Sequence, residues 1–275
     1  MSTREPRPVV FLSDYGLEDE FVGICHGVIA RIAPRVRVID LTHAIPPHDV
    51  FRGALLLADS IRFMPDDAVY LAVVDPGVGT DRPSVAVEAA SGAVFVGPDN
   101  GLLSLAIDRA GGLAKAVEIT SRKVLLEPAS ATFHGRDIFA PAVARVAAGM
   151  PLEELGRTFD TARLTRLAIA QPAIHPGLID CEVLAVDRFG NVQVNVRRSH
   201  LAAAQLQRDE EFRVRTPGGA IRVRRAVTFA EVPEGDYAAI FDSRGWLALV
   251  RNGASAANGL MVRQGDGIVI EGTDG

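Results

Sequence analysis

Two short motifs supply the side chains best suited to chemistry in this chain. The stretch VVDPGVGTDRP, residues 73–83, ends an apolar run at Asp75 and continues through a Pro-Gly-Val-Gly loop to Arg82. The glycines allow the loop to fold back, which would bring the Arg82 guanidinium beside the Asp75 carboxylate and keep that carboxylate ionised. In TFHGRD, residues 132–137, His134 precedes a glycine and the expected start of a helix. Together these three side chains are of the types that bind and deprotonate a water molecule.

Polar residues also follow other apolar runs in the first half of the chain. Four such runs, each rich in Val, Ile or Phe, end in Ser13-Asp14, Thr42-His43, Asp75 and Asp99-Asn100. A single strand-end Asp is more often a turn residue or a helix cap. Because ligands of open α/β sheets bind outside the carboxyl ends of the strands, four such ends together predict one shared crevice.

Phosphate binding and metal binding are the two alternatives for these residues. The loop glycines could present N–H groups to an anion, but the chain lacks both G-x-x-x-x-G-K-[ST] and a G-x-G-x-x-G that opens a helix. A hard or borderline metal ion could draw on Asp14, Asp19, Asp75, Asp99, His43 and His134. No H-x-x-x-H, H-E-x-x-H or D-x-D pair is present, and Arg82 would compete with a cation, so no metal is expected.

Composition limits the class of protein. The 275 residues are 48% hydrophobic and 23% charged, with a formal net charge of −5, which argues against sequence-independent binding of nucleic acid. Cys25 and Cys181 lie far apart and form no C-x-x-C motif, which fits a reducing compartment. The polar start MSTREPRP lacks the apolar region of a signal peptide, and no apolar run reaches the roughly 18 residues of a membrane span. A soluble cytoplasmic protein is predicted, with neither nucleic acid nor membrane as a partner.

The pattern of apolar residues predicts two domains. Over residues 1–168, short apolar runs alternate with helical periodicity in segments 20–34, 49–64 and 137–149, the last with Asp137 as its N-cap. This alternation is typical of a layered α/β domain with a mostly parallel sheet. Residues 168–178, AIAQPAIHPG and its surroundings, are predicted to be a linker. Residues 178–275 carry strand patterns separated by Gly, Asn and Asp, which predict a smaller antiparallel β-barrel-like domain.

Two motifs of the second half carry polar and aromatic side chains. DRFGNV, residues 187–192, places an acid, an aromatic ring and an amide within five positions. SRGWLALVRN, residues 243–252, has the pattern of a turn followed by a strand. On local grounds alone both motifs are explained as turns, since Asn and Gly are favoured there.

Seven motifs taken in order resemble one known family. SDYGLEDEFVG, DLTHAIPPHDV, VVDPGVGTDRP, GPDNGLLS, TFHGRDIFAP, DRFGNVQVN and DSRGWLALVRN are similar to those of the S-adenosylmethionine hydroxide adenosyltransferases, the hydrolytic relatives of fluorinase and chlorinase. The resemblance runs from about residue 8 to residue 272. It implies an N-terminal α/β domain, a C-terminal β-barrel-like domain, and a homotrimer whose substrate sites lie between subunits. It also implies that Asp75, Arg82 and His134 form the water-activating trio.

The resemblance implies further contacts in the N-terminal domain. Asp14 matches a residue that binds the ribose hydroxyls, and Asp19 matches one that binds the methionine ammonium. His48 stands where the halogenases place a ribose-packing Trp, and Phe21 replaces a small polar residue near the amino-acid tail.

Contacts of the C-terminal domain follow in the same way. The resemblance assigns the methionine end of the substrate to Asp187, Ser243 and Arg244. It assigns the adenine to Phe189, Asn191, Phe229 and Arg251.

The expected activity is hydrolysis of S-adenosyl-L-methionine (SAM) at the ribose 5′ carbon, giving adenosine and L-methionine without a cofactor. Asp75 and His134 are expected to orient and deprotonate the water, with Arg82 positioning it and stabilising the developing hydroxide. Because the Asp75 carboxylate would repel a halide ion, the sequence falls on the hydrolytic side of the family. The alternatives are a SAM-dependent 5′-halogenase, a metal-dependent hydrolase, and a non-catalytic adenosine or SAM binder.

Overall fold

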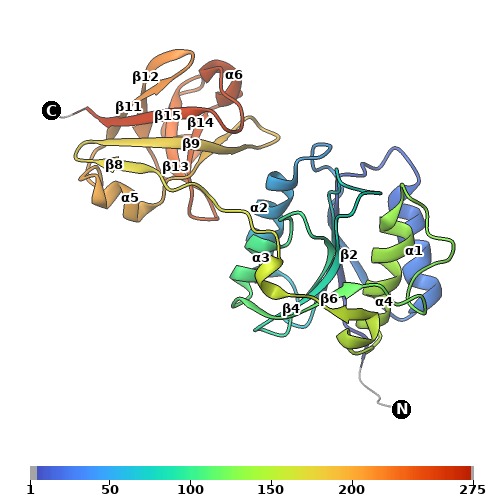
Figure 1. The fold of residues 1–275 in the computed structure, drawn as a ribbon. Coiled ribbons are helices and arrows are strands. Elements are labelled where there is room, and N and C mark those ends of the chain that lie inside the picture. Colours follow the sequence, from blue (N-terminus) through green and yellow to red (C-terminus); the bar gives the residue numbers. More distant parts are fainter. Residues whose placement is uncertain (1–4, 274–275) are drawn as a thin grey trace. The chain divides into compact units, whose positions relative to one another are not determined.

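The computed structural model of the chain describes residues 5–273 and divides it into two compact units (Figure 1). The first unit is Met1–Ala168 and the second is Ile169–Gly275. Each unit has its own hydrophobic core, and each is described by itself below.

The N-terminal unit is built on a seven-stranded mixed sheet. The strand order is β2-β1-β3-β5-β4-β6-β7. The strands are β1 (Val9–Ser13), β2 (Val38–Thr42), β3 (Val69–Val73), β4 (Ser84–Ala89), β5 (Val94–Pro98), β6 (Leu113–Ile119) and β7 (Gly156–Thr158). Strands β2, β1, β3 and β5 pair in parallel, whereas β4, β6 and β7 extend the sheet with antiparallel pairings. The parallel strands therefore place their carboxyl ends along one edge of the sheet.

Helices cover both faces of this sheet, as Figure 1 shows. Helices α1 (Phe21–Ile32) and α4 (Ala140–Ala147) share one core with Val9 and Phe11 of β1. The opposite face packs Val10 and Leu12 into a second core, on the side of α2 (Val50–Ser60) and α3 (Ser104–Arg109). Because successive residues of a strand point to opposite faces, a run such as VVFLS must be apolar throughout to serve two cores. This three-layer arrangement explains the absence of alternation in the N-terminal strands.

The helices predicted in segments 20–34 and 49–64 are confirmed as α1 and α2, whereas the N-cap predicted at Asp137 is wrong. Asp49 caps α2 by accepting a hydrogen bond from the Arg52 N–H at 2.9 Å, and a 3₁₀ turn, Ile61–Phe63, follows that helix. Asp137 is not an N-cap, because it lies inside a π-helical turn, Gly135–Phe139, which leads directly into α4. Its buried carboxylate instead pairs with the neighbouring Arg136 and accepts a hydrogen bond from the Ser130 N–H at 2.7 Å.

The C-terminal unit is a closed antiparallel barrel with one parallel pairing. Its strands are β9 (Leu178–Val186), β10 (Val192–Val194), β11 (Glu211–Thr216), β12 (Gly219–Arg225), β13 (Tyr237–Phe241), β14 (Leu247–Arg251) and β15 (Gly267–Gly272). They pair in the order β10-β14-β13-β12-β11-β15-β9, and β10 also pairs with β9, which closes the barrel. Closure gives each of these seven strands a neighbour on both sides, so the unit protects its strand edges without covering helices.

The segment predicted to be a linker contributes to this barrel. Residues Ala173–His175 form strand β8, which pairs antiparallel with β9, because the proline and glycine flanking it still leave three residues free to extend. Short helices complete the chain: α5 (Arg198–Ala203), α6 (Ala256–Leu260), and the 3₁₀ turns Leu152–Leu155, Thr161–Arg163 and Phe229–Glu231.

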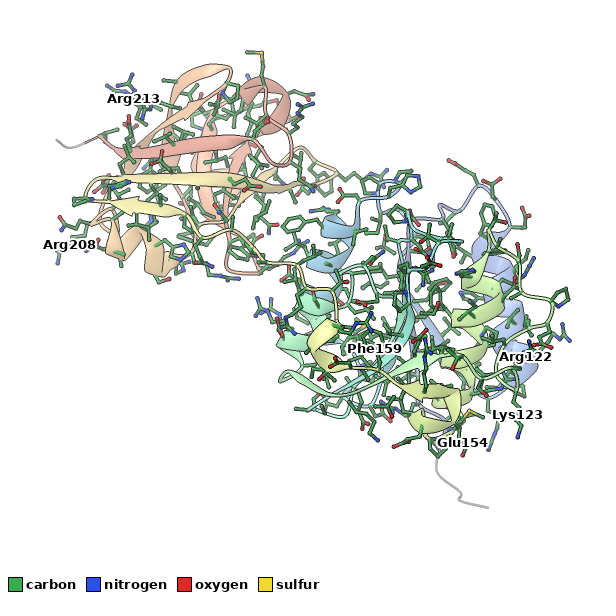
Figure 2. All side chains as sticks on the ribbon, viewed as in Figure 1. Arg122, Lys123, Glu154, Phe159, Arg208 and Arg213 are labelled. Atoms are coloured by element: carbon green, nitrogen blue, oxygen red, sulfur yellow. The ribbon has the colours of Figure 1, made fainter. Side chains whose placement is uncertain are left out.

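The charged side chains that Figure 2 labels point outward: Arg122, Lys123 and Glu154 on the first unit, and Arg208 and Arg213 on the second. Apolar side chains such as Phe159 point inward, with 7% of that residue exposed. Within residues 5–273, none of the helices has the length and apolar character that crossing a bilayer requires.

Candidate active site

The loop after β3 brings Asp75 and Arg82 together as predicted. Arg82 Nε donates to Asp75 Oδ1 at 3.1 Å and Arg82 Nη2 donates to Asp75 Oδ2 at 2.5 Å, a two-pronged ion pair whose side chains are each less than a tenth exposed. Gly79 allows the loop to fold back toward Asp75. Its φ is +79°, and a Cβ there would lie 2.6 Å from the carbonyl oxygen of Ala131. The glycine is therefore required by both conformation and space.

Arg82 also fixes the tautomer of His134. Arg82 Nη2 lies 3.0 Å from His134 Nδ1. Since a guanidinium can only donate, Nδ1 must be the unprotonated nitrogen, and a neutral His134 then carries its proton on Nε2. Burial, followed by the positive charge of Arg82, lowers the pKa of His134 from its ordinary value of 6.5. Geometry and charge thus both favour a neutral imidazole.

All five N–H donors of Arg82 are occupied by protein groups. Beyond Asp75 and His134, Nη1 donates to the carbonyl oxygen of Pro83 and to Ser84 Oγ, each at 2.9 Å. A guanidinium has five such donors in a fixed fork, so none is left for a water molecule. Asp75, in contrast, uses only part of its acceptor capacity on Arg82, because an ionised carboxylate offers about four lone-pair sites.

A cavity of about 260 Å³ opens beside this trio. Four predicted site residues line it: Asp14, His48, Asp75 and His134. Its apolar wall contains Tyr15, Phe21 and Phe133, whose rings contact one another with centroids 5.2–5.8 Å apart. Two aspartates and two histidines therefore line a cavity that also has an aromatic wall.

Tyr15 and Phe133 are site residues that the sequence reasoning missed. Burial raises the pKa of the Tyr15 phenol, so it stays protonated. A Cβ at Gly135 would lie 2.1 Å from the Tyr15 hydroxyl oxygen, so the glycine beside His134 makes room for that ring. The available signal was the position of Tyr15, directly after the strand-end Asp14.

Asp14 and His48 are joined through the backbone. The His48 N–H donates to Asp14 Oδ2 at 2.9 Å, and His48 adopts a φ of +67°, in the left-handed region that few non-glycine residues occupy. Asp19 is exposed and stands outside the residues that line the cavity. The sequence-based role of Asp19 therefore remains a prediction.

The expected meeting of four strand ends is only partly correct. Asp14 and Asp75 reach the cavity, whereas Asp99 is buried and accepts a hydrogen bond from the Thr165 N–H at 2.8 Å. Asn100 donates to the carbonyl oxygen of Val74 at 2.8 Å and so stabilises the loop after β3. His43 is buried against Ser13. These three side chains are used to hold the strand ends in place.

The C-terminal unit has a separate cavity of about 710 Å³. Five of the seven residues predicted for this unit line it: Asp187, Phe189, Asn191, Phe229 and Arg251. Asp187 organises the turn, because its Oδ1 accepts from the N–H groups of Phe189 and Asn191 and its Oδ2 accepts from Asn191 Nδ2. Phe189 and Phe229 are 78% and 44% exposed. The cavity therefore offers two aromatic rings and an amide to solvent.

Ser243 and Arg244 lie in the turn between β13 and β14, outside the residues that line this cavity. The Arg244 N–H donates to Asp242 Oδ1 at 2.9 Å, which closes the turn. Their predicted contact with a carboxylate remains a prediction.

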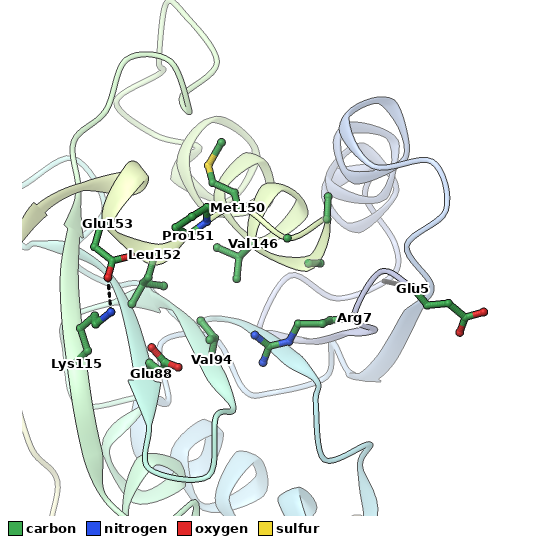
Figure 3. Close-up of a pocket in the computed structure, with 13 residues that line it drawn as sticks. Glu5, Arg7, Glu88, Val94, Lys115, Val146, Met150, Pro151, Leu152 and Glu153 are labelled. Carbon is green, nitrogen blue, oxygen red and sulfur yellow. Dashed lines mark hydrogen bonds and ion pairs between the residues drawn. The ribbon is translucent and has the colours of Figure 1, made fainter. Parts of the chain in front are cut away.

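Another cavity of the N-terminal unit, about 280 Å³ in volume, lies at the amino ends of the parallel strands, near Arg7 and Val94 (Figure 3). Its basic side chains are already paired: Lys115 with Glu153, and Arg7 with the carbonyl oxygens of Asp67, Ala68 and Gly92. Ligands of such sheets bind at the carboxyl ends of the strands. The cavity beside Asp75 is therefore the candidate active site.

The chain belongs to the SAM hydroxide adenosyltransferase family. The family's N-terminal domain matches residues 9–156 and its C-terminal domain matches residues 181–269. The chain is similar to the (R)-S-adenosyl-L-methionine hydrolase of Salinispora tropica, with 47% identity over 95% of this chain and 97% of that protein. A fluorinase of Actinoplanes sp. is 31% identical, over 90% of this chain and 92% of the fluorinase.

The fold is likewise similar to a solved structure. The crystal structure of an uncharacterized conserved protein from Thermotoga maritima superposes with a TM-score of 0.88. The two chains are 34% identical, and the match covers 95% of this chain and 99% of the other.

Proposed function

We propose that this protein hydrolyses SAM at the ribose 5′ carbon, releasing adenosine, L-methionine and a proton. The observation that carries the proposal is the fixed arrangement of Asp75, Arg82 and His134 beside a cavity walled by aromatic rings. Similarity to a named hydrolase over nearly the whole chain supports the same reaction.

Asp75 is the residue that we assign to accept the proton of the attacking water. The Nδ1 atom of His134 accepts from Arg82, so its protonated Nε2 is a donor in the resting state and stabilises the developing hydroxide. Arg82 has no donor left for the water and acts through its partners, which it holds in position. The sequence-based expectation that Arg82 itself positions the water is therefore replaced by this indirect role.

The reaction itself needs little beyond alignment and a base. Water attacks C5′ in line with the departing sulfur, the C5′–O bond forms as the C5′–S bond breaks, and the electron pair stays on neutral methionine sulfur. Because a sulfonium is already a good leaving group, we propose that neither a metal nor a cofactor takes part. Alignment can lower the activation free energy by about 7–11 kcal/mol. General-base assistance can raise the rate by a factor of about 10²–10⁴.

We further propose that the C-terminal cavity binds adenine, and that the protein works as a cytoplasmic homotrimer with its substrate sites between subunits. The exposed rings of Phe189 and Phe229 support the first point, since exposed aromatic side chains are stacking surfaces for bases. Both cysteines are free and buried, which fits a reducing compartment. Light scattering of the purified protein would measure the assembly.

The decisive experiment is product analysis in isotopically labelled water. Purified, EDTA-treated protein is incubated with SAM in H₂¹⁸O, with and without chloride. The products are separated by chromatography and their masses are measured by mass spectrometry. The expected result is adenosine carrying ¹⁸O at its 5′ hydroxyl, with unlabelled methionine, in both conditions. A chlorinated nucleoside would identify a halogenase, 5′-methylthioadenosine would place the attack on the methionine side, and unchanged SAM would identify a binding protein.

A further inference from the structure

A group of two histidines and one aspartate lies apart from the residues that line the Asp75 cavity. His26 is on helix α1, Asp40 is on strand β2, and His43 follows the end of that strand. His26 Nε2 lies 2.9 Å from Asp40 Oδ1, and His43 Nε2 lies 3.0 Å from the same oxygen. The three potential ligand atoms all lie within 4.8 Å of one another. Two imidazole nitrogens therefore converge on one carboxylate oxygen.

His43 is the member of this group whose position is hardest to explain by hydrogen bonding alone. Its side chain is 3% exposed, and its Nδ1 is bonded to Ser13 Oγ at 2.7 Å. In the described part of the chain, His43 Nε2 has no hydrogen-bond partner, although Asp40 Oδ1 lies 3.0 Å away. Buried polar atoms in native proteins are nearly always satisfied, so this nitrogen is short of a partner.

Ser13 gives His43 the support that metal-binding histidines usually have. A histidine that binds a metal through one ring nitrogen typically has its other nitrogen hydrogen-bonded, which fixes the ring and the tautomer. Ser13 plays this part from the buried end of β1. Phe11 packs edge-on against the His43 ring at a centroid distance of 4.6 Å and closes the inner side.

Solvent can reach the group from its outer side. The side chains of His26 and Asp40 are 35% and 44% exposed. Three protein ligands with one open side suit an ion that completes its coordination with water.

We propose that His26, Asp40 and His43 form a binding site for a divalent cation of the zinc class. Two imidazole nitrogens and a carboxylate oxygen are ligands that Zn²⁺ accepts, at about 2.0–2.2 Å each in tetrahedral geometry. Ligand atoms of such a site lie about 3.4 Å apart, so the present separations of 2.9 and 3.0 Å need to open by only a few tenths of an ångström. The ion would give His43 Nε2 the partner that it lacks.

A cation bound at this site would stabilise the folded state. The site joins helix α1 to the end of β2, and His43 is bonded in turn to the end of β1, the strand that delivers Asp14. A cation there would fix these three elements in the folded state alone, so its binding free energy would add to the stability of the fold. Hydrolysis at Asp75 does not depend on it, and the two proposals can fail separately.

The test is titration of tag-free, chelator-treated full-length protein with Zn²⁺, and with Co²⁺ as a spectroscopic probe. The variants are His26→Gln and Asp40→Asn, which replace half-exposed ligands, so that the buried His43 is left in place. His175→Gln is the matched control, because His175 is also an exposed histidine near an aspartate, 3.8 Å from Asp180, but belongs to no group of three ligands among residues 5–273.

We expect the wild-type protein and His175→Gln to bind one equivalent of Zn²⁺ and to show the intense visible absorption of tetrahedral Co²⁺. A Zn²⁺ concentration of about one hundred times Kd should raise Tm by roughly 5–10 °C. His26→Gln and Asp40→Asn should weaken binding by more than the roughly 10–100-fold that loss of an outer-shell partner costs. Absence of stoichiometric binding to the wild-type protein, or equal binding by all four proteins, would overturn the site.

Discussion

The cavities of the two units differ in how completely hydrogen bonds within the protein fix the side chains beside them. Beside the N-terminal cavity, Asp75 and Arg82 are less than a tenth exposed and every Arg82 donor is bonded to a protein group. In the C-terminal cavity, Phe189 is 78% exposed on a turn whose hydrogen bonds hold the backbone and leave the ring in solvent. The first cavity is preorganised for charge, and the second offers apolar surface that a ligand can cover.

This difference fits the role that we propose for each cavity. Proton transfer requires charged groups at fixed positions, because reorganisation during the reaction would cost activation free energy. Recognition of a flat heterocycle requires accessible aromatic surface, which a bound base desolvates. Changes in the N-terminal cavity should therefore act on kcat, and changes in the C-terminal cavity should act on KM.

The largest effect is expected for Asp75→Asn. Loss of the carboxylate removes the proton acceptor, so kcat should fall by about 10²–10⁴-fold while SAM binding stays measurable by calorimetry. Asp81→Asn, an exposed acid in the same loop, is the control and should leave kcat unchanged. Adenosine release by Asp75→Asn at a rate near that of the wild-type protein would refute the assignment.

Phe189→Ala should produce the converse change. Base–aromatic stacking is worth about 1–3 kcal/mol, so KM for SAM should rise by about 5–150-fold with a smaller effect on kcat. Phe63→Ala removes another exposed ring, on the N-terminal unit and outside both cavities, and should change neither constant. A fall in kcat at constant KM would show that the two cavities do not divide the work in this way.

Gly79→Ala tests how closely the loop geometry controls Arg82. A Cβ at this position would lie 2.6 Å from the Ala131 carbonyl oxygen, and φ is +79°. Backbone strain alone costs about 1–3 kcal/mol. Gly92→Ala is the control, since Gly92 has a φ of +87° but open space around its Cβ. We expect both variants to lose stability in chemical denaturation and only Gly79→Ala to lose kcat; equal kcat values would contradict the argument.

The smallest effect concerns pH. Burial and then the Arg82 charge lower the pKa of His134, so the folded state favours the neutral imidazole. Its contribution to stability is complete above pH 6.5 and is lost as pH falls through the lowered pKa. The acid limb of kcat/KM should therefore lie below pH 6.5. A profile measured across roughly pH 5–9 that turns at or above 6.5 would mean that His134 acts as a cation or is not required.

Much of the chain's architecture was readable from local patterns. Apolar runs predicted β1, β2, β3 and β5, and Asp49 predicted the start of α2, because burial and capping depend on residues that are neighbours in sequence. Strands β4 and β6 were not predicted: SVAVEA pairs with β5 and with LAKAVEI, and LAKAVEI pairs in turn with β7. Pairing between distant segments leaves only a weak local signal.

The sequence by itself determined that Asp75 and Arg82 meet, because these residues and the loop glycines lie within eight positions and their contact follows from a short turn. Only the tertiary structure decided what the more distant residues do. Arg82 meets His134 across 52 positions, which sets the tautomer of that imidazole, and Tyr15 and Phe133 join one wall from different elements. Asp99, by contrast, is held by Thr165 and used for stability. Roles of this kind depend on which segments the two cores bring together, and residue types alone do not specify them.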